Sequence, residues 1–482
     1  MANNNATTLS LEMKDVVIIK PSKPTPSCVL SLSSIDNNPE LNVLCHIIYA
    51  YQANLDDPKG QLLLDPCHVI KQGISKALVY YYPLAGKIIT NNGGDGRLGI
   101  KCNNVDDGVP FLEADANCEL SSLHYLEGID VPTAQKLVFD YDNPSLHHDQ
   151  TSQHPLVFKV TKFLCGGFTI GMGLSHAVCD GFGASQFFRA VAELASGKSE
   201  PSVKPVWERE RLIGTVLKQP LKFPLDKTSM AVSPFWPSNE LSHECFHFKG
   251  ESIKRLKMEL MKENGDDNNG KESFTTLEAL GAYVWRSKAR AMELSSDGKT
   301  LLCLAVGVRH LLDPPLPEGY YGNAFVNSNV VLTVKELNKK PLSEVVKLIK
   351  ESKKQPCNME YIRSNINMLE TMRKCNIKIG GLGASMVLTD WRQLELLDEV
   401  DFGWKASVNM IPLPWNMFGY VDMTLFLPPS NFDPSMKGGV RVYVSLPKAS
   451  MPKFKEEMEA LKIMKDEESK VVKLPNLVNL QV

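Results

Sequence analysis

The chain has 482 residues, of which 43% are hydrophobic and 22% charged, a composition typical of globular proteins rather than of disordered, fibrous or coiled-coil ones. Its 53 basic and 55 acidic residues give a formal net charge of −2, so no overall positive field attracts nucleic acid. A chain this long exceeds the size at which one hydrophobic core stops growing, and we expect two domains of roughly 200 residues each.

Strand-like runs and helical patterns alternate along the first half, with no fixed-period repeat. Strands are expected at Val16 to Ile19 and Leu156 to Val160, and a helix at Cys67 to Val79. The run Phe168 to Leu174 predicts a strand, and apolar residues at helical spacing predict a helix from Gly183 to Gly197. We therefore expect an α/β or α+β fold in which His176 lies where a strand gives way to a helix.

Six prolines recur among charged residues between Lys198 and Pro237, a composition that cannot hold a regular element. We expect an extended crossover over residues 201–237, between an N-terminal domain at 1–200 and a C-terminal domain at 238–482. Beyond it, helices are expected from Leu256 to Glu263 and from about Thr276 to Met292, separated by a polar surface loop from Asn264 to Lys271.

The cysteines and the N-terminus indicate the cellular compartment. The 11 cysteines are scattered singly with no Cys-x-x-Cys pair, which is typical of reduced thiols rather than of a zinc site or a disulfide framework. The polar N-terminus lacks the pattern of a signal peptide, and no stretch approaches about 18 consecutive apolar residues. We expect a cytoplasmic protein without a membrane partner.

The segment His176-Ala-Val-Cys-Asp-Gly181 carries the candidate chemistry. Asp-Gly is a turn pair, so a tight loop at the strand end is expected. A neutral imidazole, with an ordinary pKa near 6.5, can take a proton from an attacking hydroxyl, an effect worth about 10²- to 10⁴-fold. Alone the pattern is weak, because a histidine at a strand end is more often a satisfied structural residue.

Other chemistries lack the residues that they need. The sequence Gly173-Leu-Ser-His-Ala lacks the closing glycine of a nucleophile elbow, and no His-Glu-x-x-His or Cys/His cluster supplies metal ligands. Gly197-Lys-Ser lacks the first glycine of a phosphate loop, because Ala192 stands there. Cys179 invites a nucleophilic role, but a lone cysteine in an apolar segment is usually a small buried hydrophobe. We expect no serine hydrolase, kinase or metal site.

Two motifs together resemble those of the BAHD family of plant coenzyme-A-dependent acyltransferases. The first is His176-Ala-Val-Cys-Asp-Gly181, and the second is Asp401-Phe-Gly-Trp-Lys405, where the family has Asp-Phe-Gly-Trp-Gly. Further matches lie at Pro21 to Pro26, Tyr81 to Lys87, Phe111 to Ala116, Pro314 to Asn323 and Leu388 to Trp391. The stretches Val160 to Phe168 and Ala184 to Gly197 look most like the branch that holds taxane and benzyl alcohol acyltransferases.

The resemblance implies two similarly built domains, related to chloramphenicol acetyltransferase, with mixed sheets and a channel between them that reaches His176 from both ends. Acyl-CoA, a substrate rather than a permanent cofactor, would enter by one mouth and an alcohol or amine by the other. In the ternary complex His176 would deprotonate the acceptor, which attacks the thioester carbonyl and expels the CoA thiolate. The expected enzyme is a monomer that transfers acetyl, benzoyl or a related group to a hydroxyl of a plant specialised metabolite, with N-acylation as a variant.

The resemblance also suggests roles for the other motif residues. Asp180 would turn away from the channel and pair with Arg309, shaping the loop that holds His176, and Gly181 would serve the backbone turn behind the base, by positive φ or by close approach. Thr389 and Trp391 match positions near the reacting centre. Thr389 either donates to the oxyanion, a contact worth about 3 kcal/mol, or packs within its strand.

The CoA side is expected to involve two segments. Asp401, Phe402, Gly403 and Trp404 would form a structural loop near the CoA channel. Lys405 forbids any positive φ that the usual glycine serves, although a lysine could also meet a CoA phosphate. The resemblance places nucleotide contacts near Lys271, Ser273 and Thr275. Thr275-Thr-Leu-Glu278 also fits a capping box, and both readings can hold because a helix N-terminus attracts phosphate.

Two rival functions stay open at this point. One is a catalytically silent relative that binds an acyl ligand or a protein partner, against which the intact His176 and Asp180 argue. The other is a thioester hydrolase, which would yield free acid whether or not an alcohol is present. The motifs do not fix the acyl group or the acceptor, because side chains along the channel choose both.

Overall fold

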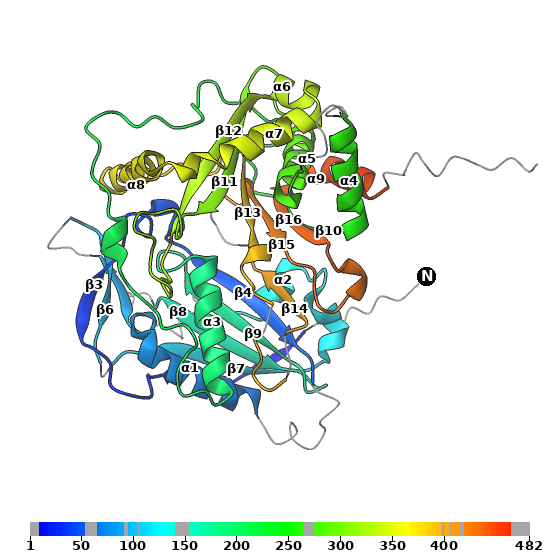
Figure 1. The fold of residues 1–482 in the computed structure, drawn as a ribbon. Coiled ribbons are helices and arrows are strands. Elements are labelled where there is room, and N and C mark those ends of the chain that lie inside the picture. Colours follow the sequence, from blue (N-terminus) through cyan, green and yellow to red (C-terminus); the bar gives the residue numbers. More distant parts are fainter. Residues whose placement is uncertain are drawn as a thin grey trace, which may run out of the picture.

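Residues 9–53, 65–90, 95–104, 106–139, 154–263, 273–397, 400–404, 407–414 and 419–463 are described by the computed structural model. They form a mixed α/β protein of two halves, each built on a large mixed sheet (Figure 1). In Figure 1 the first half of the chain fills the lower part of the molecule and most of the second half fills the upper part. Among these residues, no helix is long and apolar enough to cross a membrane.

The sheet of the first half has the strand order β1-β7-β8-β9-β4-β14, with β2 also paired to β7. Its strands are β1 (Leu11–Met13), β2 (Val17–Ile19), β4 (Leu44–Tyr51), β7 (Val109–Ala116), β8 (Leu156–Lys162), β9 (Phe168–Ser175) and β14 (Asn409–Pro412). Helices α1 (Pro66–Tyr80) and α3 (Gly181–Ala195) pack against each other over one face of this sheet (Figure 1). They approach so closely that a Cβ at Gly73 would lie 2.6 Å from the carbonyl oxygen of Val191.

The sheet of the second half has the order β10-β16-β15-β13-β11-β12. Its strands are β10 (Leu241–Phe248), β11 (Lys299–Gly307), β12 (Phe325–Thr333), β13 (Ser385–Asp390), β15 (Met423–Leu427) and β16 (Val440–Pro447). The accompanying helices are α4 (Gly250–Glu263), α5 (Thr276–Ala291), α6 (Val334–Lys339), α7 (Leu342–Ser352), α8 (Met359–Lys374) and α9 (Met451–Ile463). A small third sheet of β3 (Cys28–Ser31), β6 (Leu98–Cys102) and β5 (Lys87–Thr90) joins the first half, as does the short helix α2 (Val131–Gln135).

The two halves interlock. Strand β14 comes from the second half of the chain but pairs antiparallel with β4, so that Ile411 lies opposite Ile48 in the first sheet. The expected crossover at 201–237 holds the 3₁₀ turn η6 (Arg209–Leu212) and two bridges, from Val206 to Tyr320 and from Met230 to Lys299. The two sheets are therefore not separated by one cut in the sequence, because residues 409–412 return to the first sheet.

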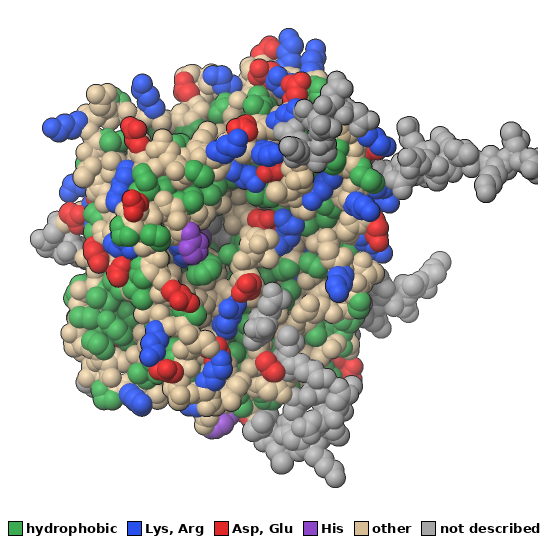
Figure 2. All heavy atoms as spheres, viewed as in Figure 1, with side chains coloured by type: hydrophobic (Ala, Val, Ile, Leu, Met, Phe, Trp, Pro, Cys, Tyr) green, Lys and Arg blue, Asp and Glu red, His purple; other side chains and the backbone are tan. Residues whose placement is uncertain are grey.

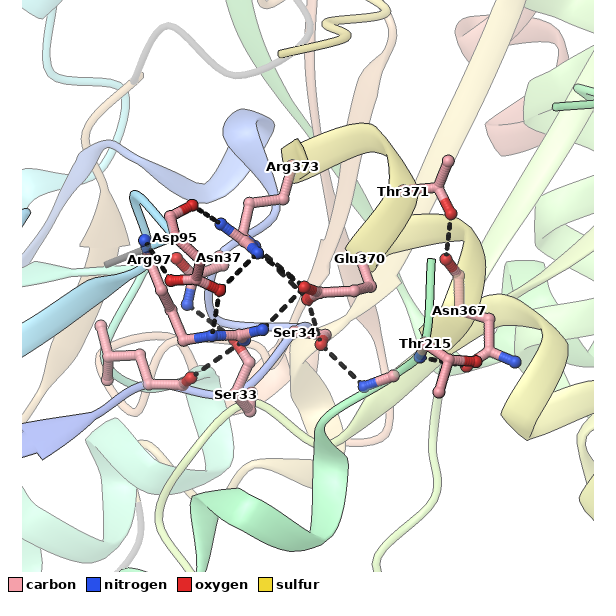
Figure 3. Close-up of polar contacts among 12 residues, drawn as sticks. Ser33, Ser34, Asn37, Asp95, Arg97, Thr215, Asn367, Glu370, Thr371 and Arg373 are labelled. Carbon is pink, nitrogen blue, oxygen red and sulfur yellow. Dashed lines mark hydrogen bonds and ion pairs between the residues drawn. The ribbon is translucent and has the colours of Figure 1, made fainter. Parts of the chain in front are cut away.

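A buried polar cluster ties α8 to the first half (Figure 3). The Glu370 carboxylate accepts hydrogen bonds from Arg97 at 2.7 Å, from Ser34 at 2.6 Å and from Arg373 at 2.7 Å. Ser34 in turn accepts from the backbone N–H of Gly214 in the crossover. Burial alone would raise the pKa of Glu370, but Arg373, Ser34 and Arg97 outweigh it and lower that pKa. The cluster thus holds the two halves and the crossover together through one carboxylate.

Most predicted elements are present, with shifted ends. The strand before His176 spans Phe168–Ser175, and the following helix begins at Gly181 instead of Gly183 because the Asp180 side chain caps it. Helix α4 begins at Gly250, six residues before the expected Leu256. The expected polar loop from Asn264 to Lys271 lies outside the described residues.

Candidate active site

His176 lies in the tight turn between β9 and α3. Its backbone N–H donates to the carbonyl of Val43 at 2.9 Å, and its ring faces the Phe325 ring edge-on at 6.3 Å. The side chain is half-buried, and Nδ1 is enclosed with no hydrogen-bond partner in the described part of the chain. The backbone of His176 is therefore held in place, and Nε2 is the nitrogen left for a substrate.

Burial lowers the pKa of His176 below its ordinary value of 6.5, because an apolar environment disfavours the charged imidazolium. Its own backbone carbonyl, the Asp180 carboxylate and the Asn323 side chain act in the opposite direction without reversing the shift. At neutral pH the ring is consequently uncharged, the form that a general base requires.

Asp180 and Arg309 form the expected ion pair, with Arg309 Nη2 2.8 Å from Asp180 Oδ1. The same carboxylate caps α3 by accepting from the Gly183 N–H at 3.0 Å, and its second oxygen accepts from the Ala324 N–H at 3.2 Å. Burial would raise the pKa of Asp180, but Arg309 and these two N–H groups outweigh it and lower that pKa. The carboxylate is thus committed to the loop, the helix start and the segment before β12.

Gly181 and Gly183 both meet neighbouring groups closely. A Cβ on Gly181 would lie 2.5 Å from Cδ1 of Leu394, so this glycine serves a close approach rather than a positive φ. At Gly183 a Cβ would lie 1.9 Å from the Tyr321 carbonyl oxygen, which the backbone cannot relieve. The stricter requirement for glycine therefore falls on Gly183, which the motif does not single out.

Cys179 is buried, and burial raises the pKa of its thiol, so it lacks the thiolate character of a nucleophile.

Thr389 and Trp391 lie at the end of β13. Thr389 is half-buried and pairs with Leu425 of β15, and its role at the oxyanion stays a prediction. Trp391 is 7% exposed and belongs to the hydrophobic core of the first half. This end of the second sheet thus reaches into the first domain.

The segment Asp401 to Trp404 packs as a structural loop. Asp401 accepts from the Gly403 N–H at 2.7 Å, and Gly403 has a φ of +99°. The Phe402 ring packs against Tyr51 and Phe188, and the Trp404 ring meets Phe168 edge-on at 5.2 Å. Both motif aromatic rings are buried in the core of the first half. Lys405 lies outside the described residues.

The expected CoA segment is described only in part, since Lys271 lies outside it. Thr275 caps α5, and Thr275 and Glu278 form a complete capping box. Glu278 also pairs with Lys353. The capping interpretation of Thr275 is correct, while contacts of Ser273 and Thr275 with CoA stay predictions.

Three buried residues behind His176, namely Asn323, Asp36 and Arg209, were given no role by the sequence. Asn323 donates from Nδ2 to the His176 carbonyl oxygen and to Asp36 Oδ1, each at 2.7 Å. Asp36 Oδ2 accepts from Arg209 Nη1 at 2.8 Å, in an ion pair whose side chains are 0% and 1% exposed. Asn323 ends the matched segment from Pro314, but no local pattern links it to Asp36, 287 positions away.

A cavity of about 790 Å³ lies between α3 and segments of the second half. Phe182, Gln186 and Arg309 line it, together with Tyr320 and Leu394, and His176 is not among the lining residues. The face in Figure 2 carries charges of both signs and is hollowed near its centre. The cavity therefore lies beside Arg309, the partner of Asp180 in the ion pair.

The chain matches the model of the Transferase family over residues 9–461. It is 42% identical to the spermidine coumaroyl-CoA acyltransferase of Arabidopsis thaliana, covering 94% of this chain and 96% of the relative. It is 31% identical to the taxadien-5-alpha-ol O-acetyltransferase of Taxus chinensis, covering 94% and 98%.

Solved structures give the same fold. Vinorine synthase superposes with a TM-score of 0.71 at 22% identity, covering 94% of this chain and 98% of that one. The F. sporotrichioides TRI101 complexed with coenzyme A and T-2 superposes with a TM-score of 0.65 at 16% identity, covering 90% and 98%. The chain therefore belongs to the Transferase family, as a BAHD-type acyltransferase of two domains whose acyl donors are coenzyme A thioesters.

Proposed function

We propose that this enzyme transfers an acyl group from coenzyme A to a primary or secondary amine of a polyamine, with His176 as general base. Support for the acceptor comes from the relatives at 42% and 41% identity, which are named spermidine coumaroyl-CoA and spermidine sinapoyl-CoA acyltransferases. These relatives shift the expectation from an acetyl or benzoyl ester towards a hydroxycinnamoyl amide.

The observation that carries the mechanism is the uncharged imidazole of His176, with its backbone held in the turn, beside a carboxylate that is committed elsewhere. An alkylammonium, with a pKa near 10, has no lone pair, so the acceptor first loses one proton to the solvent and reacts as the neutral amine. The nitrogen lone pair then forms a bond to the thioester carbon while His176 takes a second proton, from the N–H of the attacking amine. The tetrahedral oxyanion then collapses, the C–S bond breaks, and the CoA thiolate leaves and recovers a proton from the imidazolium.

Other residues support this reaction without taking the proton. Asp180 and Arg309 hold the loop, and Thr389 is proposed to donate to the oxyanion. Ser273 and Thr275 at the start of α5, with Lys271 and Lys405, are proposed to meet the charged nucleotide end of CoA.

O-acylation of an alcohol is the second candidate, which the Taxus O-acetyltransferase at 31% identity favours. N-acylation and O-acylation share the general-base step and differ in the acceptor that the channel admits.

A panel of acyl-CoA donors tests the proposal. Acetyl-, benzoyl-, coumaroyl- and sinapoyl-CoA are each offered with spermidine, with an aliphatic alcohol or with water alone, and products are identified by mass spectrometry while free thiol is counted. We expect acyl-spermidine from a hydroxycinnamoyl donor. Ester alone would move the assignment to O-acylation, free acid in every reaction would indicate a hydrolase, and no thiol release would indicate a silent relative.

A further inference from the structure

Asn323 is buried in the segment between Arg309 and β12, and its amide orientation is fixed by its neighbours. Nδ2 donates to the His176 carbonyl oxygen and to Asp36 Oδ1. A flipped amide would set Oδ1 against two acceptors, an arrangement without a donor. Oδ1 therefore points the other way, where it is buried and has no hydrogen-bond partner among the described residues.

The orphaned oxygen has a counterpart in His176. Nδ1 of that ring is likewise buried and has no hydrogen-bond partner among the described residues, and each such atom costs about 1–3 kcal/mol if it stays unpaired. Burial lowers the pKa of His176, and its own backbone carbonyl, the Asp180 carboxylate and the Asn323 side chain oppose this shift. The backbone carbonyl already accepts from Asn323 Nδ2, and an amide favours a protonated ring through its oxygen. Hydrogen bonds at catalytic groups are often long before substrates bind and shorten in the substrate complex.

Asn323 is itself held from two other parts of the chain. Asp36, from the first half, accepts both the Asn323 backbone N–H at 3.2 Å and its side-chain amide. Arg209, from the crossover, donates to Asp36 and is packed 4.4 Å from the ring centroid of Trp207 and 5.1 Å from that of Tyr321. The catalytic turn is thus fastened at both ends, at Asp180 by Arg309 and at His176 by Asn323.

We propose that Asn323 is a positioning residue for His176, whose amide nitrogen fixes the His176 carbonyl and whose oxygen accepts the Nδ1 proton when substrates bind. This inference rests on the proposed general-base role of His176. A proton held on Nδ1 leaves the Nε2 lone pair free for the acceptor, so Asn323 selects the working tautomer. Asp36 and Arg209 act indirectly, because Asp36 accepts a hydrogen bond from Asn323 and Arg209 pairs with Asp36.

The test compares Asn323→Leu, which keeps the volume but removes both contacts, with Asn409→Ala. Asn409 is also fully buried, and it bonds to Arg441 at 2.7 Å and to the Tyr125 carbonyl at 2.9 Å, in a cluster that does not include His176. We expect Asn323→Leu to lower kcat roughly 10- to 100-fold, as is usual when a supporting residue is removed, with KM unchanged. Asn409→Ala is expected to keep kcat.

Each substitution is also made in the His176→Ala background. If a residue acts only through the imidazole, its substitution should cause no further loss of kcat there. A persisting loss from Asn323→Leu there would overturn the proposal, since Asn323 would then act on the substrate directly. An unchanged kcat in the otherwise wild-type enzyme would overturn it as well. If instead His176→Ala kept full activity, the general-base role itself would fail, which separates the two claims.

A smaller substitution covers the case in which Asn323→Leu does not fold. Asn323→Ala removes the same two contacts without placing apolar bulk beside the buried ion pair of Asp36 and Arg209, so we expect a comparable loss of kcat that also vanishes in the His176→Ala background. ¹⁵N spectra of labelled histidine give an independent readout, in which the wild-type His176 signal is that of the Nδ1–H tautomer. A predominant Nε2–H tautomer in the wild-type enzyme with a bound substrate analogue would contradict the proposal.

Discussion

Replacing Asp180 by alanine should damage stability as much as activity. The substitution leaves the Arg309 guanidinium, 12% exposed in the ion pair, without its partner, and it removes the acceptor of the Gly183 and Ala324 N–H groups. Breaking a buried pair from one side costs about 3–5 kcal/mol, and a lost helix cap by itself costs about 1 kcal/mol, so the unpaired guanidinium dominates the loss. We therefore expect Asp180→Ala to lower the free energy of unfolding by about 3–5 kcal/mol.

The assay is denaturant-induced unfolding, with kcat measured on the same preparations. Glu395→Ala is the matched control. It breaks the ion pair of Glu395 with Arg189 of α3, in which the Glu395 side chain is 61% exposed and the Arg189 side chain 33%. Exposed pairs of this kind contribute under about 1 kcal/mol. A double variant, Asp180→Ala with Arg309→Ala, should lose less than the sum of the single losses. A large fall in kcat with an unchanged free energy of unfolding would refute the reasoning and return Asp180 to a catalytic role.

Three further predictions concern Glu370, Phe402 and the pH profile. Glu370→Gln should destabilise the protein by about 3 kcal/mol. The difference from wild type should shrink as the pH falls below 4.5, the ordinary pKa of a glutamate, towards the lowered pKa of Glu370 in the folded protein; an equal difference at pH 3 and pH 7 in equilibrium unfolding would contradict this. Phe402→Ala should lower the free energy of unfolding by about 3–5 kcal/mol, because its ring is 2% exposed, and a loss under about 1 kcal/mol would speak against a structural second motif. Because the neutral base is required and burial lowers the pKa of His176, the limb of the kcat/KM profile that belongs to the enzyme should lie below pH 6.5, separate from the limb near pH 10 that belongs to the acceptor amine; an additional limb between pH 7 and pH 9 would exclude His176 as the titrating base.

Local patterns predicted the elements that build the catalytic turn. The apolar run of β9, the spacing of α3 and the capping box of α5 each express one element's own preferences, and these are readable from neighbouring residues. Strand β14 is different, because it has four residues and pairs with β4 in the other half of the chain. A short strand acquires its identity from its partner, which no local pattern contains.

The residues of the candidate site also fall into a group that local motifs predict and a group that only long-range packing brings together. His176 and Asp180 stand four residues apart in one motif, and the family resemblance supplied Arg309. The cluster behind the turn joins Asp36 to Arg209 and Asn323 across 173 and 287 positions. Its members are ordinary polar residues whose meaning comes from burial and mutual orientation, and these exist only once the two halves have packed together.

In the proposed mechanism His176 removes the proton from the acceptor. The most direct measurement is the single-turnover rate of acyl transfer to spermidine by His176→Ala beside the wild-type enzyme, with coumaroyl-CoA and sinapoyl-CoA as donors. We predict a rate lower by about 10²- to 10⁴-fold, with unfolding unchanged within about 1 kcal/mol. A variant that transfers the acyl group at the wild-type rate would contradict the account.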